Sequence, residues 1–183
     1  MLLTGAMRGL ALISALGVSG LLSAATLEKL SMDDMVQKST DIVCATVTAT
    51  SSFVKGPLIY TRYRILVSQR WKGPEAAQMD IAVPGGQYGI QNQIFSGAPK
   101  LQMGKEYMLY LWTSKSGLTQ VIGLTQGLFG VSRNSQGVAS VSRAAGTETM
   151  LDAASGLQIT DQSVRMPLKD VSATINRILR KSN

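Results

Sequence analysis

The chain has 183 residues, which suits one compact domain with small appendages, and a formal net charge of +7 from 18 basic and 11 acidic side chains. It has no histidine and one cysteine. This excludes a Ser-His-Asp triad, an imidazole metal site, an intramolecular disulfide and a thiolate cluster. We therefore expect no metal and no other cofactor, and a general base would have to be a carboxylate or a lysine.

Residues 1–25 have the order of a secretory signal peptide. Arg8 provides a positive start, an uncharged and largely apolar run extends from Gly9 to Leu22, and Ser23-Ala24-Ala25 offers the small residues of a cleavage site. A membrane anchor is the alternative, but the run is shorter than the roughly 20 residues that a spanning helix needs. We predict cleavage near Ala25 and export, to the periplasm or as a secreted protein, with no membrane span left after cleavage.

A short helix is predicted next, followed by strands. Ser31 can cap a helix over Ser31–Lys38, and Asp33 and Asp34 suit the positive end of its dipole. The run from Ile42 to Thr50 is rich in β-branched residues and therefore predicts a strand. Cys44 lies in this run. We interpret it as a buried small apolar side chain, with a reactive or dimer-forming thiol as the alternative.

Strand patterns separated by turns continue to residue 143. Apolar and polar residues alternate from Leu58 to Trp71, which predicts a strand with two different faces between turns at 51–57 and 72–74. Further strands are predicted over residues 78–83, 106–112, 118–122, 128–133 and 138–141, with a long polar connection over 87–103. Many short strands with regular turns predict a mainly β domain over residues 26–143, built as a small barrel or sandwich.

The C-terminal part, residues 144–183, is predicted to be a surface excursion followed by a helix. Residues 144–163 have few apolar side chains. From Pro167 to Lys181, apolar residues recur at helical spacing, at positions 171, 175, 178 and 179. We expect this helix to pack on the β domain.

Glycine-rich turns and scattered acids give little sign of catalysis. Pro84-Gly85-Gly86 follows a strand but lacks both a following helix and dinucleotide-fold spacing, and the glycines from Gly97 to Gly104 are spaced wrongly for a phosphate loop. We interpret both as turns. A carboxylate-dependent hydrolase would need two acids facing each other across a cleft. The candidate acids are Glu75, Asp80 and Glu106, whose other interpretation is a solvated strand face.

One face of the strand over residues 58–72 is strongly basic. Side chains at even positions share a face, and here they include Tyr60, Arg62, Arg64, Arg70 and Lys72. Arginines beside an aromatic ring can hold phosphates, sulfates or carboxylates. The alternative is a solvated face that discourages edge aggregation. For an exported chain, an anionic envelope polymer or an acidic protein is a better partner than nucleic acid.

The order of several short motifs resembles a family of exported bacterial proteins with no established activity. The motifs are Ser39-Thr40-Asp41-Ile42-Val43, Ile59-Tyr60-Thr61, Trp71-Lys72-Gly73, Pro84-Gly85-Gly86, Gly97-Ala98-Pro99, Gly104-Lys105-Glu106-Tyr107 and Gly123-Leu124-Thr125-Gln126-Gly127. The layout is also similar, more distantly, to netrin-like domains, including tissue inhibitors of metalloproteinases. That resemblance implies an OB-like β-barrel with flanking helices. The inhibitors use an N-terminal cysteine to reach the metal, and this chain has no matching cysteine.

These observations together predict an exported, non-catalytic binding module with an OB-like barrel, a short N-terminal helix and a C-terminal helix. We expect it to recognise an acidic polymer or protein surface through the basic strand face. A loop containing Pro84, Gly85, Gly86, Gly97 and Pro99 is expected to assist. A modulator of a secreted protease, suggested by the netrin-like layout, is the second hypothesis, and the carboxylate-dependent hydrolase is the third.

Overall fold

The computed structural model describes residues 26–146 and 148–181, so the predicted signal peptide lies outside the described residues. The described part of the chain is mainly β, which confirms the predicted class, and it contains two helices, α1 (Met32–Lys38) and α2 (Leu168–Lys181). The longer strands are β2 (Asp41–Lys55), β3 (Leu58–Lys72), β4 (Gln78–Pro84), β7 (Glu106–Thr113), β9 (Leu128–Arg133), β10 (Ala139–Arg143) and β13 (Val164–Pro167). The short ones are β1 (Thr26–Glu28), β5 (Gly86–Tyr88), β6 (Gln91–Gln93), β8 (Thr119–Val121), β11 (Thr149–Leu151) and β12 (Gln158–Ile159).

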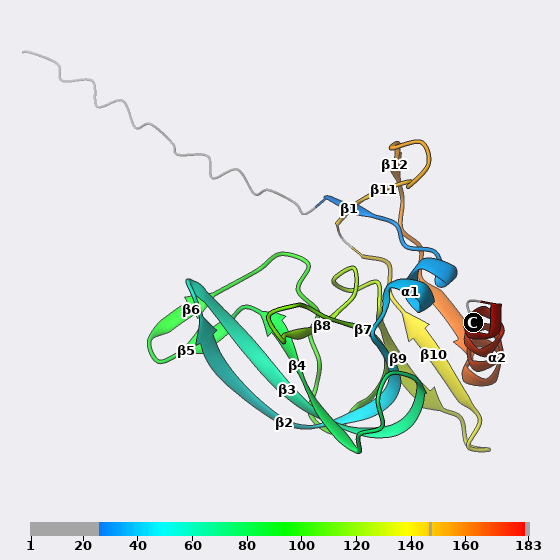
Figure 1. Ribbon diagram of the computed structural model, residues 1–183, viewed down its shortest axis with the longest axis horizontal. Coiled ribbons are helices and arrows are strands. Elements are labelled where there is room, and N and C mark those ends of the chain that lie inside the picture. The colour runs from blue at the N-terminus through cyan, green and yellow to red at the C-terminus, as the bar shows by residue number, and fades with distance from the viewer. Residues whose placement is uncertain (1–25, 147, 182–183) are drawn as a thin grey trace, which may run out of the picture.

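One strongly curved sheet forms the body of the molecule. Its strands follow the order β13-β10-β9-β7-β2-β3-β4, and β8 pairs with β7 beside this path. The sheet curls so that β4 comes close to β8, but no pairing among the described strands joins the two ends of the path (Figure 1). The predicted closure into a barrel is therefore not observed. Curling of a twisted sheet alone produces the rounded shape.

The central strands of this sheet contribute to two hydrophobic cores, one on each face. Residues 41–45 of β2 and 108–111 of β7 are buried on both faces of the sheet. This is why these runs are continuously apolar in sequence, apart from Asp41, and do not alternate. On the inner, concave face, Val43, Ile65, Ile81 and Leu109 pack together. The opposite face packs against both helices through Ile42, Cys44, Met108 and Tyr110, among others. Such burial is the dominant favourable contribution to folding.

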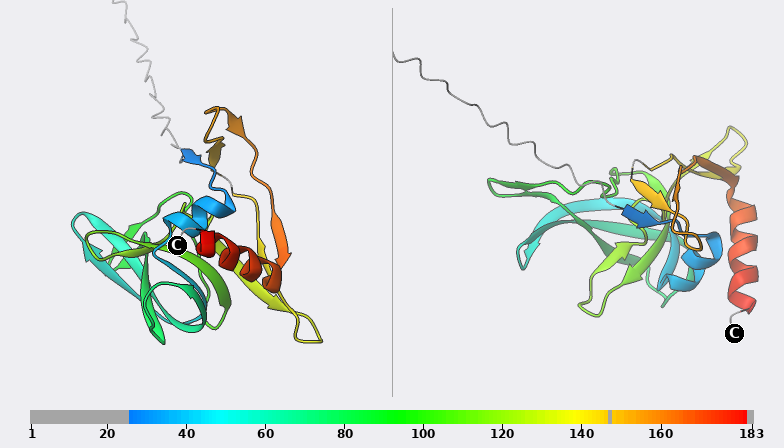
Figure 2. Two further views of the ribbon diagram at one scale, coloured as in Figure 1. Left: turned by 45° about the vertical axis from the view of Figure 1, so that its right-hand side comes forward. Right: turned by 90° about the horizontal axis from the view of Figure 1, so that it is seen from above.

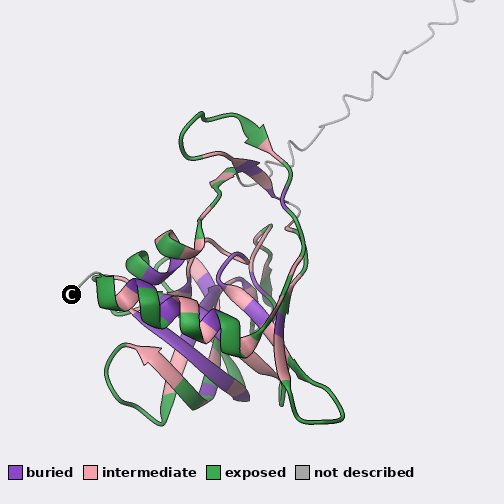
Figure 3. Cartoon of the chain, turned by 90° about the vertical axis from the view of Figure 1, so that its right-hand side faces the viewer, coloured by how far each residue is buried: buried purple, intermediate pink, exposed green. Residues whose placement is uncertain are grey.

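The two helices lie side by side on the outer face of the sheet (Figure 2). A capping box begins α1: the Ser31 hydroxyl accepts from the Asp34 backbone N–H at 3.0 Å, and the Asp34 carboxylate accepts from the Ser31 backbone N–H at 3.1 Å. In α2, Val171, Ile175 and Ile178 are buried against this face, as their helical spacing predicts (Figure 3).

Two predicted boundaries are wrong. Residues 51–55 of the predicted turn continue β2, because the reversal needs only the short connection around Gly56, whose φ is +60°. Residues 144–163 are predicted as a surface excursion, but they carry β11, which pairs with β1 in parallel and with β12. β13 follows directly and returns to pair with β10. The part around β12 does project from the body as an exposed loop (Figure 3).

The single cysteine is buried, as predicted: Cys44 is free and is packed in the core beneath the helices. Burial raises the pKa of its thiol to about 12. We expect Cys44 to resist alkylation by iodoacetamide at pH 8 in the native protein and to react readily in urea. Mass spectrometry of the two samples measures this, and rapid labelling without urea would contradict the buried position.

Candidate functional site

The first half of β3 places three of the predicted residues together. Tyr60 stacks on Phe53 of β2, with ring centroids 5.4 Å apart, and the Arg62 guanidinium lies 4.7 Å from the Phe53 ring centroid. Arg64 lies opposite Asp80 of β4 and donates from Nε to Oδ1 at 3.0 Å. We call Phe53, Tyr60, Arg62 and Arg64 the arginine surface.

A single carboxylate serves both arginines of this surface. Asp80 Oδ2 lies 3.8 Å from Arg62 Nε, while its main partner is Arg64. The hydrogen bond from Arg64 lowers the pKa of Asp80, so the carboxylate is ionised at neutral pH. Two guanidinium charges face one carboxylate charge, which leaves an excess of positive charge on an exposed strand face.

Arg70 does not join the arginine surface. The register between β2 and β3 shifts three times, and Ser68 and Trp71 have no partners of their own in β2. These bulges break the simple alternation of sides on which the prediction rested. Arg70 Nη1 donates to Asp41 Oδ1 at 2.6 Å, and both side chains are about nine-tenths buried, at 12% and 9% exposure.

Lys72 is also engaged inside the fold, together with its neighbours. Its Nζ donates to the carbonyl oxygens of Val36 and Gln37 at 2.8 and 3.0 Å, at the C-terminal end of α1. Desolvation lowers the pKa of this ammonium group. Trp71 Nε1 donates to Ser172 Oγ of α2 at 2.7 Å. The Trp71-Lys72-Gly73 motif thus ties β3 to both helices.

The five predicted loop residues do not form one site but lie in three places. Gly85 and Gly86 lie where β5 begins, and a Cβ on Gly86 would collide with the Thr61 hydroxyl of β3. Both have positive φ, which favours glycine. Pro84 and Pro99 line a small cavity between β4 and β8. Gly97 lies against the carboxyl group of Glu148.

A hairpin of β5 and β6 extends the end of the molecule that carries the arginine surface (Figure 1). Gln93 fastens it, because its Oε1 accepts from the Ile59 backbone N–H at 2.7 Å. Apolar side chains on the hairpin and directly after it are exposed: Ile90 at 102% and Tyr88 at about half on the hairpin, and Ile94 at 84% just beyond β6. Sequence reasoning assigned residues 87–103 to a polar connection and missed this apolar tip, because isolated apolar residues show no periodicity.

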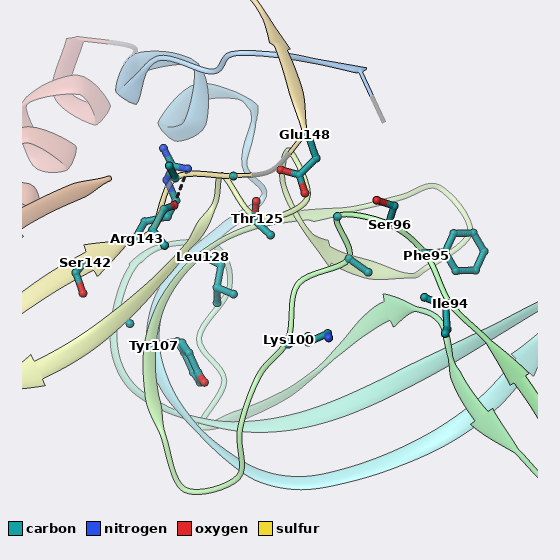
Figure 4. A pocket seen from close by; sticks show the side chains of 16 residues that line it. Ile94, Phe95, Ser96, Lys100, Tyr107, Thr125, Leu128, Ser142, Arg143 and Glu148 are labelled. Atoms are coloured by element: carbon teal, nitrogen blue, oxygen red, sulfur yellow. Dashed lines mark hydrogen bonds between the residues drawn. The ribbon is translucent and has the colours of Figure 1, made fainter. Parts of the chain in front are cut away.

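A cavity of about 610 Å³ lies between the 94–100 loop, β7, β9 and the segment after β10 (Figure 4). Its apolar wall includes Tyr107 and Leu128, while Lys100, Thr125 and Glu148 contribute polar groups. Thr125 Oγ1, Arg143 Nε and Glu148 Oε2 are buried and have no hydrogen-bond partner among the described residues. The sequence gives no signal for this cavity, because its walls come from segments far apart in the chain.

One wall of the cavity is held by a buried ion pair. Arg143 Nη2 donates to Asp161 Oδ1 at 3.0 Å, Arg143 Nη1 donates to Asp161 Oδ2, and the Gly146 backbone N–H donates to the same Oδ2 at 2.7 Å. The Arg143 guanidinium holds the pKa of Asp161 at about 2, well below its usual range, and the Gly146 N–H acts in the same direction.

The three acids considered for hydrolysis do not line the large cavity. Asp80 binds Arg64, while Glu106 binds Arg133 at 3.0 Å and accepts from the Ser68 hydroxyl at 3.1 Å. Glu75 is exposed in the turn between β3 and β4. Within the described ranges, no group of three or more His, Cys, Asp or Glu side chains is arranged to hold a metal ion.

Among the helices described, none has the length and apolar character needed to span a bilayer. The chain matches no family model, no curated protein and no solved structure.

Proposed function

We propose that this protein is an exported, non-catalytic interaction module that binds an acidic polymer or an acidic protein surface through the arginine surface. The observation that carries the proposal is the sharing of Asp80 by Arg62 and Arg64 next to the Phe53–Tyr60 stack. A guanidinium group can bind carboxylate, sulfate or phosphate in a bidentate manner. The excess positive charge is therefore presented by groups suited to anions.

The neighbouring apolar tip supports a protein or polymer partner over a small ion. Tyr88 and Ile90 are exposed on the β5–β6 hairpin and Ile94 directly after it, at the same end of the β2–β3 hairpin as the arginine surface. The hairpin packs on the other face of β3, where Gly86 lies against Thr61, so a partner that contacts both features reaches around the edge of the sheet. Aromatic residues and arginine are enriched at protein interfaces. Exposed apolar side chains stabilise a complex because their surface is removed from water on binding. The partner that fits both features has acidic groups beside apolar ones.

The experiment measures binding to poly-L-glutamate by the wild type and by Arg62→Ala/Arg64→Ala. We expect the double variant to bind about tenfold more weakly or worse, and wild-type binding to weaken as salt rises because exposed charges are screened. The matched control is Arg177→Ala/Arg180→Ala, which removes the same charge from exposed positions of α2.

The control separates a specific surface from net charge. If both double variants lose affinity equally, the interaction depends only on overall charge and the arginine surface has no special role. Salt-insensitive binding of the wild type would also contradict the proposal.

The relationship to the exported bacterial family and to netrin-like domains is likewise a proposal. Its support is the order of α1, the long β2–β3 hairpin, β4 and β7, together with the curvature that brings β4 near β8. An OB-like barrel left open between these two strands is the arrangement we propose. Titration of a secreted metalloprotease with the protein tests the modulator hypothesis, and unchanged protease activity would remove it.

A further inference from the structure

The large cavity holds an acidic group that the fold leaves unused. Glu148 is 9% exposed and lines the cavity, and its Oε2 has no hydrogen-bond partner among the described residues. Buried carboxyl groups are ordinarily paired or hydrogen-bonded, because an unpartnered one loses its hydration without compensation. From this geometry we infer that the cavity is a second binding site, separate from the arginine surface, which takes a ligand with a primary ammonium group on an apolar body.

The chain around Glu148 is built to receive its carboxyl group. A Cβ on Gly146 would collide with Oε2, and one on Gly97 would lie 2.5 Å from Oε1. Gly97 also has a φ of +75°, which other residues rarely adopt. The carboxyl group therefore lies between two backbone segments that have no side chains there. Neither segment gives Oε2 a hydrogen bond.

A second oxygen on the same wall defines the ligand chemistry. Thr125 Oγ1 is buried and also lacks a partner among the described residues, and Figure 4 shows it with Glu148 on the upper side of the cavity. The third unpartnered atom, Arg143 Nε, is a donor on a guanidinium group whose charge is already paired with Asp161. A carboxylate accepts only, and a hydroxyl can accept as well. A primary ammonium group has three donors and no acceptor, and its charge complements Glu148. It can satisfy both oxygens at once.

The rest of the cavity selects the body of the ligand. Tyr107 and Leu128 provide apolar contact, and both pack against the inner core of the sheet. Lys100 and Arg143, the latter paired with Asp161, line the same cavity, and Glu148 offers one negative charge, so a second positive charge on the ligand would have no partner there. A monoamine with an aliphatic or aromatic body therefore fits better than a polyamine. A volume of about 610 Å³ is within the range of small-molecule sites.

The test uses hexylammonium, with 1-hexanol as a neutral probe of similar shape, and follows the backbone amide signals of Gly97 and Gly146 by NMR titration. We expect hexylammonium to bind about tenfold or more tightly than hexanol, because hydrogen bonds to charged groups are the stronger ones. Glu148→Gln keeps the shape and removes the charge, so this preference should disappear.

The control is Glu75→Gln, which removes the same charge from an exposed turn and should keep the preference. Thr125→Val is the second variant; it keeps the side-chain shape, leaves Glu148 in place and should weaken hexylammonium binding while leaving hexanol unchanged. Thermal unfolding of each variant shows whether it is folded. Equal binding of the two probes, or a preference that survives Glu148→Gln, would overturn the inference.

Discussion

Replacing Asp161 with asparagine is expected to lower the free energy of unfolding by about 3 kcal/mol at neutral pH, because removing one partner of a buried pair leaves the other charge uncompensated. The Arg143 and Asp161 side chains are 10% and 2% exposed. Asp161 also accepts from the Gly146 backbone N–H. Urea unfolding followed by tryptophan fluorescence measures the loss. Asp33→Asn, at an exposed position of α1, is the matched control and should lower the free energy of unfolding by at most about 0.5 kcal/mol.

The same comparison has a pH dependence whose direction follows from the pKa of Asp161. This pKa is about 2 in the folded protein, where the Arg143 guanidinium stabilises the carboxylate, against an ordinary value of 3.8. A carboxyl group with a lowered folded-state pKa stabilises the protein above its unfolded pKa, and this stabilisation is lost as the pH falls through the folded value. The difference between wild type and Asp161→Asn should therefore shrink by up to about 2 kcal/mol below pH 4. A difference that stays constant from pH 6 to pH 2 would contradict the assignment.

The second large effect is expected at Arg70. Arg70→Met should lower the free energy of unfolding by about 3 kcal/mol, because among the described residues it leaves the buried Asp41 carboxylate with the Thr40 hydroxyl as its one side-chain donor. Gly73 is part of this arrangement. A Cβ there would overlap Asp41, and its φ of +99° favours glycine. Urea unfolding measures the change, and Arg177→Met on the exposed side of α2 is the control.

A double-mutant cycle separates the ion pair from the packing of Arg70. Asp41→Asn combined with Arg70→Met removes both charges, so its cost should be smaller than the sum of the single variants by about 1–3 kcal/mol. Strict additivity would mean that Arg70 acts through its aliphatic stem and that the pair itself contributes nothing.

The ion pairs Arg64–Asp80 and Arg70–Asp41 show why the predicted basic face of β3 is only partly right. Alternation correctly placed Tyr60, Arg62 and Arg64 on one side of β3, because no shift interrupts β3 between these positions. The bulges at Ser68 and Trp71 then change which face of the sheet the following side chains of β3 occupy. The carboxylate that binds Arg70, that of Asp41, is 29 positions earlier in the chain. A one-residue slip reverses the faces of a strand, and local sequence patterns do not show where it occurs.

The sequence by itself determined the features that depend on near neighbours. These include the strand over residues 58–72, the cap of α1 at Ser31, the apolar stripe of α2 and the burial of Cys44. Each follows from periodicity or from hydrogen bonds within one turn of the chain.

Only the tertiary structure decided whether the sheet closes, what Arg70 and Lys72 bind, and that Glu148 and Thr125 line one cavity. These features need the register of paired strands and the curvature of the whole sheet, which bring together residues distant in the chain. The physical reason is that the hydrogen-bond partners of a buried carboxyl group come from segments distant in the sequence, and these meet only in the folded chain.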